Sequence, residues 1–484
     1  MRRVRMPVVT AVAVAGLGWV LLAGAGPVVA GVPSAGAGGW DKAIEVPGIA
    51  ALNKGGAAAI LSVSCAAAGG CAAGGQYRAF GHEQAFVVSE AGGRWRRAIE
   101  VPGTAALNKG GDAAIESVSC AAAGGCAAGG FYIDGSGHTQ AFVVSEAGGR
   151  WRTAIKVPGT AALNTGGVAQ VRSVSCAAAG SCAAGGVYRV GPNREQAFVV
   201  SEAGGRWRTA IKVPGTAALN TRRFAEVESV SCAAAGSCAA GGFYAAGSGG
   251  EQAFVVSEAG GRWRKAIEVP GTAALNTGGV AEVRSVSCAA AGGCAAGGDY
   301  LDGSGNMEAF VVTEADGRWR TAIEVPGTAA LNKGGDALVN SVSCAAAGSC
   351  AAGGFYADSR FGHLQAFVVT KAGGRWRKAI EVPGTAALNT GGNAAIESVS
   401  CAAAGSCAAG GFYRDGSGHQ QAFVVSEADG RWRTAIEVPG TAALNTGGDA
   451  AINSVSCAAP HGCAAGGHYK DGSRHHQAFV VSKP

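Results

Sequence analysis

The stretch "SVSCAAAGGCAAGG", residues 62–75, places two cysteines six positions apart among residues that have almost no side chain. It returns, with small changes, seven more times along the 484-residue chain. All 16 cysteines fall into such pairs. Since no pair has two further ligands at zinc-motif spacing, the pattern indicates eight local disulfides rather than metal sites. The predicted pairs are Cys65–Cys71, Cys120–Cys126, Cys176–Cys182, Cys232–Cys238, Cys288–Cys294, Cys344–Cys350, Cys401–Cys407 and Cys457–Cys463.

Tryptophans keep the same step as the cysteines. They recur every 55 to 57 residues, and a period of this size with short strands is typical of propeller blades. The eight positions are Trp40, Trp95, Trp151, Trp207, Trp263, Trp319, Trp376 and Trp432. A length that would otherwise suggest about three domains is therefore expected to form one.

Residues 62–117 show how one module predicts four antiparallel strands. "SVSCA" and "CAAGGQY" can pair across a tight turn of small residues, and "QAFVVSE" is apolar on both faces, as a buried strand is. In the fourth strand, "WRRAIEV", alternation places Trp95, Ile99 and Val101 on one face and Ala98 on the other. "PGTAALNKGG" follows as a polar connector to the next blade.

The two ends of the repeat array are out of phase. At Trp40 the array opens with a fourth-strand sequence, "WDKAIEVPG", and it stops after a third-strand "QAFVVS" with no tryptophan strand behind it. We therefore predict an all-β fold, a closed eight-bladed β-propeller of four-stranded antiparallel blades whose last blade is completed by the N-terminal strand. Another β-repeat, such as a solenoid, is the alternative.

The N-terminus has the pattern of a secretory leader. Three arginines precede a long apolar run and then small residues, which predicts a signal peptide over 1–30, with cleavage after Ala30 or as late as Ala37. A retained signal anchor is the alternative. Residues 31–38 are then a short spacer and 39–484 the propeller, and the mature chain is expected to be secreted and to have no membrane span.

The repeats "SVSC", "GxCAAGG", "QAFVVS", "RW" and "VPG" resemble those of secreted actinobacterial β-propeller repeat proteins, and the resemblance covers nearly all of residues 40–482. It implies an extracellular propeller and supplies no catalytic residues. Without the three leader arginines, 36 basic residues face 33 acidic ones, which argues against a nucleic-acid partner.

Motifs for chemistry are almost absent from the sequence. "GHEQAF" at 81–86 has phenylalanine where a zinc-protease helix needs its second histidine, and neither a phosphate-binding loop nor a nucleophile elbow occurs. We predict no catalytic residue, metal or cofactor. Because the modules are nearly identical, whereas an enzyme site needs different residues at one spot, we expect a non-catalytic binding or interaction propeller for envelope glycan or an extracellular protein. A structural envelope component without a discrete ligand and a secreted hydrolase or lyase are the alternatives.

A binding site is expected on the face that carries the connectors and the hairpins between second and third strands. One module departs outright there, with Arg222, Arg223 and Phe224 where the others have two glycines and one further residue. From these two cations and this aromatic ring we predict a binding site for an anionic or sugar ligand, with neutral drift as the alternative. Further candidates on the connectors are Lys54, Lys109, Lys333, Asp112, Asp336 and Asp449.

Overall fold

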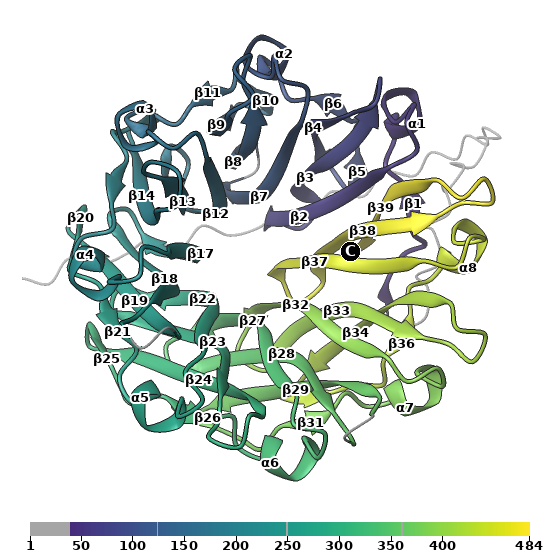
Figure 1. Ribbon diagram of the computed structural model, residues 1–484. Helices are drawn as coiled ribbons and strands as arrows, with labels where there is room; N and C mark the ends of the chain where they lie inside the picture. The colour runs from purple at the N-terminus through teal and green to yellow at the C-terminus, as the bar shows by residue number, and fades with distance from the viewer. Residues whose placement is uncertain (1–38, 123, 248–249, 360–361) are drawn as a thin grey trace, which may run out of the picture. The chain divides into compact units, whose positions relative to one another are not determined.

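In the computed structural model, residues 39–122, 124–247, 250–359 and 362–484 are described. They form eight antiparallel sheets arranged as blades around a common axis (Figure 1). The predicted signal peptide and spacer lie outside the described residues. Blade 1 comprises β2 (Ala58–Ala67), β3 (Gly70–Ala79), β4 (His82–Ala91), β5 (Arg94–Trp95) and β6 (Ile99–Glu100).

The next six blades repeat this order of strands. Blade 2 contains β7 (Ala113–Ala122), β8 (Gly125–Ile133), β9 (Thr139–Ala147), β10 (Arg150–Trp151) and β11 (Ile155–Lys156); blade 3 contains β12 (Ala169–Ala178), β13 (Ser181–Arg189), β14 (Glu195–Ala203), β15 (Arg206–Trp207) and β16 (Ile211–Lys212). Blade 4 contains β17 (Ala225–Ala234), β18 (Ser237–Ala245), β19 (Glu251–Ala259), β20 (Arg262–Trp263) and β21 (Ile267–Glu268); blade 5 contains β22 (Ala281–Ala290), β23 (Gly293–Leu301), β24 (Met307–Ala315), β25 (Arg318–Trp319) and β26 (Ile323–Glu324). Blade 6 contains β27 (Ala337–Ala346), β28 (Ser349–Ala357), β29 (Leu364–Ala372), β30 (Arg375–Trp376) and β31 (Ile380–Glu381); blade 7 contains β32 (Ala394–Ala403), β33 (Ser406–Arg414), β34 (Gln420–Ala428), β35 (Arg431–Trp432) and β36 (Ile436–Glu437).

Blade 8 joins the two ends of the described chain. It combines β37 (Ala450–Ala459), β38 (Gly462–Lys470) and β39 (His476–Lys483) with the N-terminal β1 (Ile44–Glu45). In Figure 1 the purple β1 lies beside the yellow β39, and Ile44 pairs with Val480. The predicted eight-bladed closure is therefore confirmed.

The fourth strand differs from the prediction. Its two pieces both pair with the third strand, but their registers differ by one residue: Trp95 faces Glu90, whereas Ile99 faces Val87. A one-residue slip turns every later side chain to the other face of the sheet. Ile99 is consequently 43% exposed, while Ala98 is buried and donates its N–H to the carbonyl of Pro47 in the preceding connector. The expected alternation was wrong because nothing in the local pattern signals this bulge.

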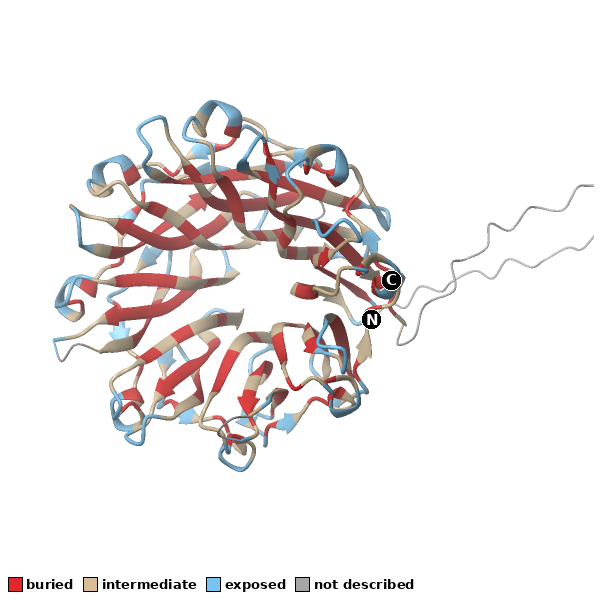
Figure 2. Cartoon of the chain, turned by 45° about the vertical axis from the view of Figure 1, so that its right-hand side comes forward, coloured by how far each residue is buried: buried red, intermediate tan, exposed pale blue. Residues whose placement is uncertain are grey.

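Small residues near the axis let neighbouring blades approach closely. A Cβ on Gly74 would lie 2.7 Å from Cγ2 of Ile115 in the next blade, whereas one on Gly75 would collide with the Ala59 carbonyl oxygen of the neighbouring strand in the same blade. All eight predicted disulfides form within their own blades, and no cysteine is free. The apolar core lies between the sheets, where each blade buries one phenylalanine completely (Figure 2). These are Phe86, Phe142, Phe198, Phe254, Phe310, Phe367, Phe423 and Phe479.

Each connector contains a one-turn helix that the sequence analysis describes only as a loop. The eight helices are α1 (Ile49–Leu52), α2 (Thr104–Leu107), α3 (Thr160–Leu163), α4 (Thr216–Leu219), α5 (Thr272–Leu275), α6 (Thr328–Leu331), α7 (Thr385–Leu388) and α8 (Thr441–Leu444). None of the helices in the described part of the chain is long and apolar enough to cross a membrane.

The two faces of the ring carry different turns, as predicted. On one face the connectors meet the hairpins between second and third strands, since the Glu83 N–H donates to Asp112 Oδ1 at 2.9 Å. We call this the connector face. On the other, the disulfide turns meet the turns after the third strands, since the Gly93 N–H donates to the Gly69 carbonyl at 3.2 Å. We call this the disulfide face.

Candidate functional site

The three predicted lysines lie on three separate connectors of the ring. Lys54, Lys109 and Lys333 are exposed on connectors that leave three different blades. Lys54 Nζ donates to the carbonyl of Ala50 in the preceding helix α1, at 3.2 Å. The structure therefore brings none of them into a common site.

The three predicted aspartates are also in separate connectors, where they make local contacts. Asp112 accepts the backbone N–H of Glu83 and lies 3.5 Å from Nδ1 of His82. Asp449 lies 3.7 Å from Nε2 of His468 and 3.2 Å from Nε2 of His476, and these two imidazoles, His468 foremost, hold the pKa of Asp449 below the usual range. Burial raises the pKa of Asp336.

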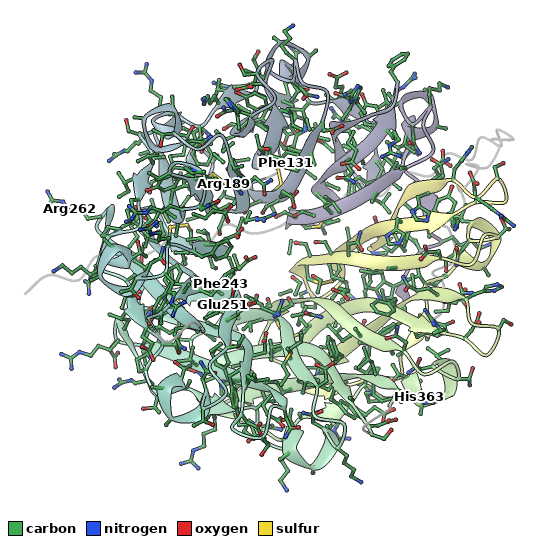
Figure 3. All side chains as sticks on the ribbon, in the orientation of Figure 1. Phe131, Arg189, Phe243, Glu251, Arg262 and His363 are labelled. Carbon is green, nitrogen blue, oxygen red and sulfur yellow. A yellow bond between two sulfur atoms is a disulfide. The ribbon has the colours of Figure 1, made fainter. Side chains whose placement is uncertain are left out.

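Arg222, Arg223 and Phe224 separate into different environments. The Arg222 guanidinium donates to the Gly247 carbonyl at 3.1 Å. Phe224 is half-buried and stacks on Phe243 of blade 4, with ring centroids 5.4 Å apart; Figure 3 labels Phe243. Arg223 lines a cavity that contains neither Arg222 nor Phe224 in its wall. The structure thus places the three side chains in different surroundings, and their binding of an anionic or sugar ligand stays a prediction.

Blade 7 shows a set of contacts on the connector face of which each recurs in several other blades. The Tyr413 hydroxyl donates to Glu437 in the fourth strand at 3.3 Å, and the Gln421 amide donates to Asp415 in the hairpin at 3.0 Å. Asn445 of the connector in turn donates to Gln421 Oε1 at 2.8 Å. The carboxylates of Asp415 and Glu437 therefore accept hydrogen bonds that join the third strand to the hairpin and the second strand to the fourth. We call this group of residues, together with the hairpin and connector residues beside it, the corner of the blade.

Blade 3 replaces four residues of this corner. Val190 stands where blade 7 has Asp415, and Lys212 stands in place of Glu437. Arg194 replaces a histidine and Arg223 a glycine, at the positions of His419 and Gly448 in blade 7. Val190 removes a negative charge, and Lys212 replaces a negative by a positive charge. Arg194 and Arg223 each add a positive charge. All four therefore alter the charge in the same direction.

The four replacements line one cavity of about 350 Å³ between the hairpin, the fourth strand and the connector after α4. No carboxylate lines it, and none lies within ion-pair distance of Arg194, Lys212 or Arg223 among the described residues. Burial lowers the pKa of Lys212, and the neighbouring Arg194 lowers it further. The cavity thus holds positive charge without a counter-ion from the protein.

Two polar groups in this cavity have lost their usual partners. Gln196 is only 5% exposed, and its Oε1 has no hydrogen-bond partner, because Asn220 donates instead to the Glu195 carbonyl. Tyr188 faces Lys212 instead of a glutamate, and burial raises its pKa to about 12. A sugar hydroxyl would donate to Gln196 Oε1, and a ligand oxygen would accept the Tyr188 hydroxyl.

Arg223 occupies a backbone conformation that glycine normally takes. Its φ is 75°, whereas the equivalent glycine has a φ of 112° in Gly111 and of 76° in Gly448. A side chain in this left-handed region costs about 1 kcal/mol, so an arginine there is an outlier that calls for a functional explanation. The histidine that packs on this glycine in blade 7 is also absent, because blade 3 has Arg194 there.

Blade 2 shares one of the four changes. Lys156 occupies the position of Lys212, but Asp134 is retained and accepts the Gln140 amide at 2.8 Å. The lysine alone therefore does not open the hydrogen-bonded corner, and blade 2 serves as an internal control.

The first strands, nearest the axis in Figure 1, also differ in charge. One position carries Glu116, Arg172, Glu228, Arg284 and Glu397 in five of the blades. Burial and the neighbouring Glu226 raise the pKa of Glu228 to about 7, although Arg172 opposes this. These residues lie outside the connectors, where no variation was expected, and an alignment of the repeats by column reveals them.

No model of a known protein family matches the chain, and no curated protein matches it. Among solved structures, Sqt1 from Chaetomium thermophilum bound to the N-terminus of ribosomal protein L10 is 9% identical, with a TM-score of 0.48 over 88% of this chain and 97% of that one. A GH74 xyloglucanase from Xanthomonas campestris is 14% identical, with a TM-score of 0.45 over 90% of this chain and 60% of that one. A Hadza microbial sialidase is 12% identical, with a TM-score of 0.34 over 72% and 73%. These likenesses carry no inference about activity.

Proposed function

We propose that the protein is a secreted, non-catalytic binding propeller whose blade 3 captures an anionic group on its connector face. The observation that carries the proposal is the cavity lined by Arg194, Lys212 and Arg223 without a carboxylate. Cations that lack a protein partner attract phosphate or carboxylate groups, and arginine can bind either in a bidentate manner.

The ligand fits best as an anionic group on an envelope glycan. The cavity opens on a face formed by loops, where a polymer can approach, and its volume suits one charged sugar or phosphate unit. An extracellular location is part of the proposal, since eight disulfides persist in oxidising compartments and the sequence predicts a leader. N-terminal sequencing of protein recovered from culture medium tests this part.

The binding test restores blade 3 to the common pattern with Val190→Asp, Arg194→His, Lys212→Glu and Arg223→Gly. Calorimetric titrations at low salt use short-chain polyphosphate and oligogalacturonate as probes, with dextran as the uncharged polymer. We expect saturable binding of at least one anionic probe, a loss of tenfold or more in the restored protein, and weaker binding as salt rises. Lys156→Glu makes the same charge change in blade 2 and should alter affinity less than twofold.

Other outcomes distinguish the alternatives. Equal affinity in the restored protein would place the ligand elsewhere. Retention in the envelope fraction without saturable binding of either probe would favour a structural component. Shortening of either polymer during the titration would favour a hydrolase or lyase.

A further inference from the structure

On the disulfide face, a repeated contact joins neighbouring blades. The indole N–H of Trp151 in blade 2 donates to Ser89 Oγ of blade 1 at 3.0 Å, and this hydroxyl donates to Glu146 of blade 2 at 2.8 Å. The hydroxyl thus accepts one hydrogen bond and donates another. The glutamates at this position are almost fully buried, and they are Glu90, Glu146, Glu202, Glu258, Glu314 and Glu427.

Two blades carry lysine in place of this glutamate. In blade 6, Lys371 Nζ donates to Thr313 Oγ1 at 3.0 Å, and in blade 8, Lys483 Nζ donates to Ser426 Oγ at 3.0 Å. The indole nitrogens of Trp376 and Trp40 are then buried without a hydrogen-bond partner. Lysine donates hydrogen bonds where glutamate accepts them. Each of these two contacts therefore has more hydrogen-bond donors than acceptors.

Lys371 is 3% exposed, and no carboxylate lies within ion-pair distance of it among the described residues. Its ammonium has three hydrogens, and Thr313 accepts one of them. A buried cation without a counter-ion and a buried N–H without an acceptor both destabilise the folded protein. Burial lowers the pKa of Lys371, as expected from this cost. One acceptor with negative charge would satisfy both groups.

A cavity of about 710 Å³ lies at this contact, between the disulfide turns of blades 5 and 6. Its lining includes Lys371 and Trp376 together with the acidic residues Glu314 and Asp316, and the exposed Ile323 supplies apolar surface. The corresponding cavity between blades 2 and 3, of about 380 Å³, has two glutamates in its wall, Glu146 and Glu202. The larger cavity is thus the one in which lysine replaces a glutamate, and its volume is in the range of ligand-binding pockets.

We propose that the cavity between blades 5 and 6 is a second ligand site that binds a small organic carboxylate, whose oxygens accept hydrogen bonds from Lys371 Nζ and Trp376 Nε1. The apolar part of the ligand lies against Ile323. This site is on the face opposite the blade 3 cavity, it uses different residues, and it does not depend on the function proposed above.

The test uses the full chain and records the indole N–H resonances by NMR during titration with benzoate and with glucuronate; benzyl alcohol and glucose are the uncharged counterparts. Trp376→Phe assigns the Trp376 resonance. We expect this resonance to shift and saturate with at least one carboxylate and with neither uncharged compound. Lys371→Glu restores the contact of the other blades, so it should fold and should weaken binding tenfold or more.

Lys483→Glu makes the same change in blade 8 and should leave the carboxylate affinity of the Trp376 site within twofold of wild type. The proposal is overturned if neither carboxylate gives a saturable shift of Trp376, or if Lys371→Glu binds as tightly as wild type. It is also overturned if the uncharged counterparts bind equally well, because the site would then not recognise the carboxylate.

Discussion

Blades 3 and 7 share one frame and differ at one corner. In both blades a disulfide links the first strand to the second, and a phenylalanine of the third strand is completely buried. We call these paired strands the frame of the blade. On the connector face, however, blade 7 closes its corner with the carboxylates of Asp415 and Glu437, whereas blade 3 has a cavity with cations and no carboxylate. The comparison indicates that the repeat preserves the fold, and the site that we propose lies where one repeat departs from the common sequence.

The largest effect should come from breaking the frame itself. Removal of residues 39–48 deletes β1, whose Ile44 pairs with Val480, together with the buried Trp40. Because β39 then becomes an open edge, we expect loss of the folded monomer, seen as aggregation in size-exclusion chromatography and loss of the thermal transition. The chain that begins at residue 39 is the reference. A monomer with an unchanged melting temperature would show that β1 does not close the ring.

Disulfide removal tests whether blades 3 and 7 contribute equally to the frame. Replacing both cysteines by alanine in blade 3 (Cys176 and Cys182) or in blade 7 (Cys401 and Cys407) should each lower the free energy of unfolding by about 2 kcal/mol, the value for so short a loop. Denaturant titration measures both. Since the two frames match, a blade 3 loss several times larger than that of blade 7 would contradict the comparison.

The axis offers a pH test, because blade 3 presents Arg172 there and blade 7 presents Glu397. Glu228 of the neighbouring blade 4 has a pKa of about 7 in the folded protein, because burial raises it from the ordinary value of 4.5 although Arg172 opposes the shift. The unfolded chain therefore releases this proton at lower pH, so stability falls as pH rises from about 4.5 to about 7.

Glu228→Gln removes this contribution. The variant should equal wild type near pH 4 and exceed it by roughly 1–2 kcal/mol above pH 7.5, allowing for partial screening by solvent. Denaturant titrations at several pH values provide the measurement, and a constant difference between the two proteins across this range would oppose the assignment.

A smaller effect should separate the two tyrosines. Tyr413→Phe in blade 7 removes the donor to a half-buried Glu437, so we expect a loss of about 1 kcal/mol. Tyr188→Phe in blade 3 removes no bond to a carboxylate and should change the free energy of unfolding by less than about 0.5 kcal/mol. Equal losses measured by denaturant titration would mean that Tyr188 has a partner equivalent to Glu437.

Much of the fold follows from the sequence because each blade is built from local pairings. The spacing of Cys65 and Cys71 predicts their strand register, and the out-of-phase ends predict the closure. The bulge before Ile99 could not be predicted, since it depends on the bond from Ala98 to Pro47 of the preceding connector. Tertiary contacts, not the local pattern, decide that register.

The candidate site could be predicted only in part. Arg223 stands out because it replaces a glycine in a single repeat. Val190, Arg194 and Lys212 are up to 22 positions apart in the chain and meet Arg223 only because hairpin, fourth strand and connector converge on one face. Comparing the repeats column by column would have shown that all four depart in the same blade, but their proximity requires the fold.

Anomalous scattering from selenate tests the central claim most directly. Crystals in which the blade 3 cavity touches no neighbouring molecule are soaked in selenate. The anomalous signal of its selenium atom marks the position of this oxyanion. We predict the strongest anomalous peak between Arg194, Lys212 and Arg223, no comparable peak beside Lys156, and loss of the peak in Lys212→Glu. An empty blade 3 cavity, or an equal peak at Lys156, would contradict the account.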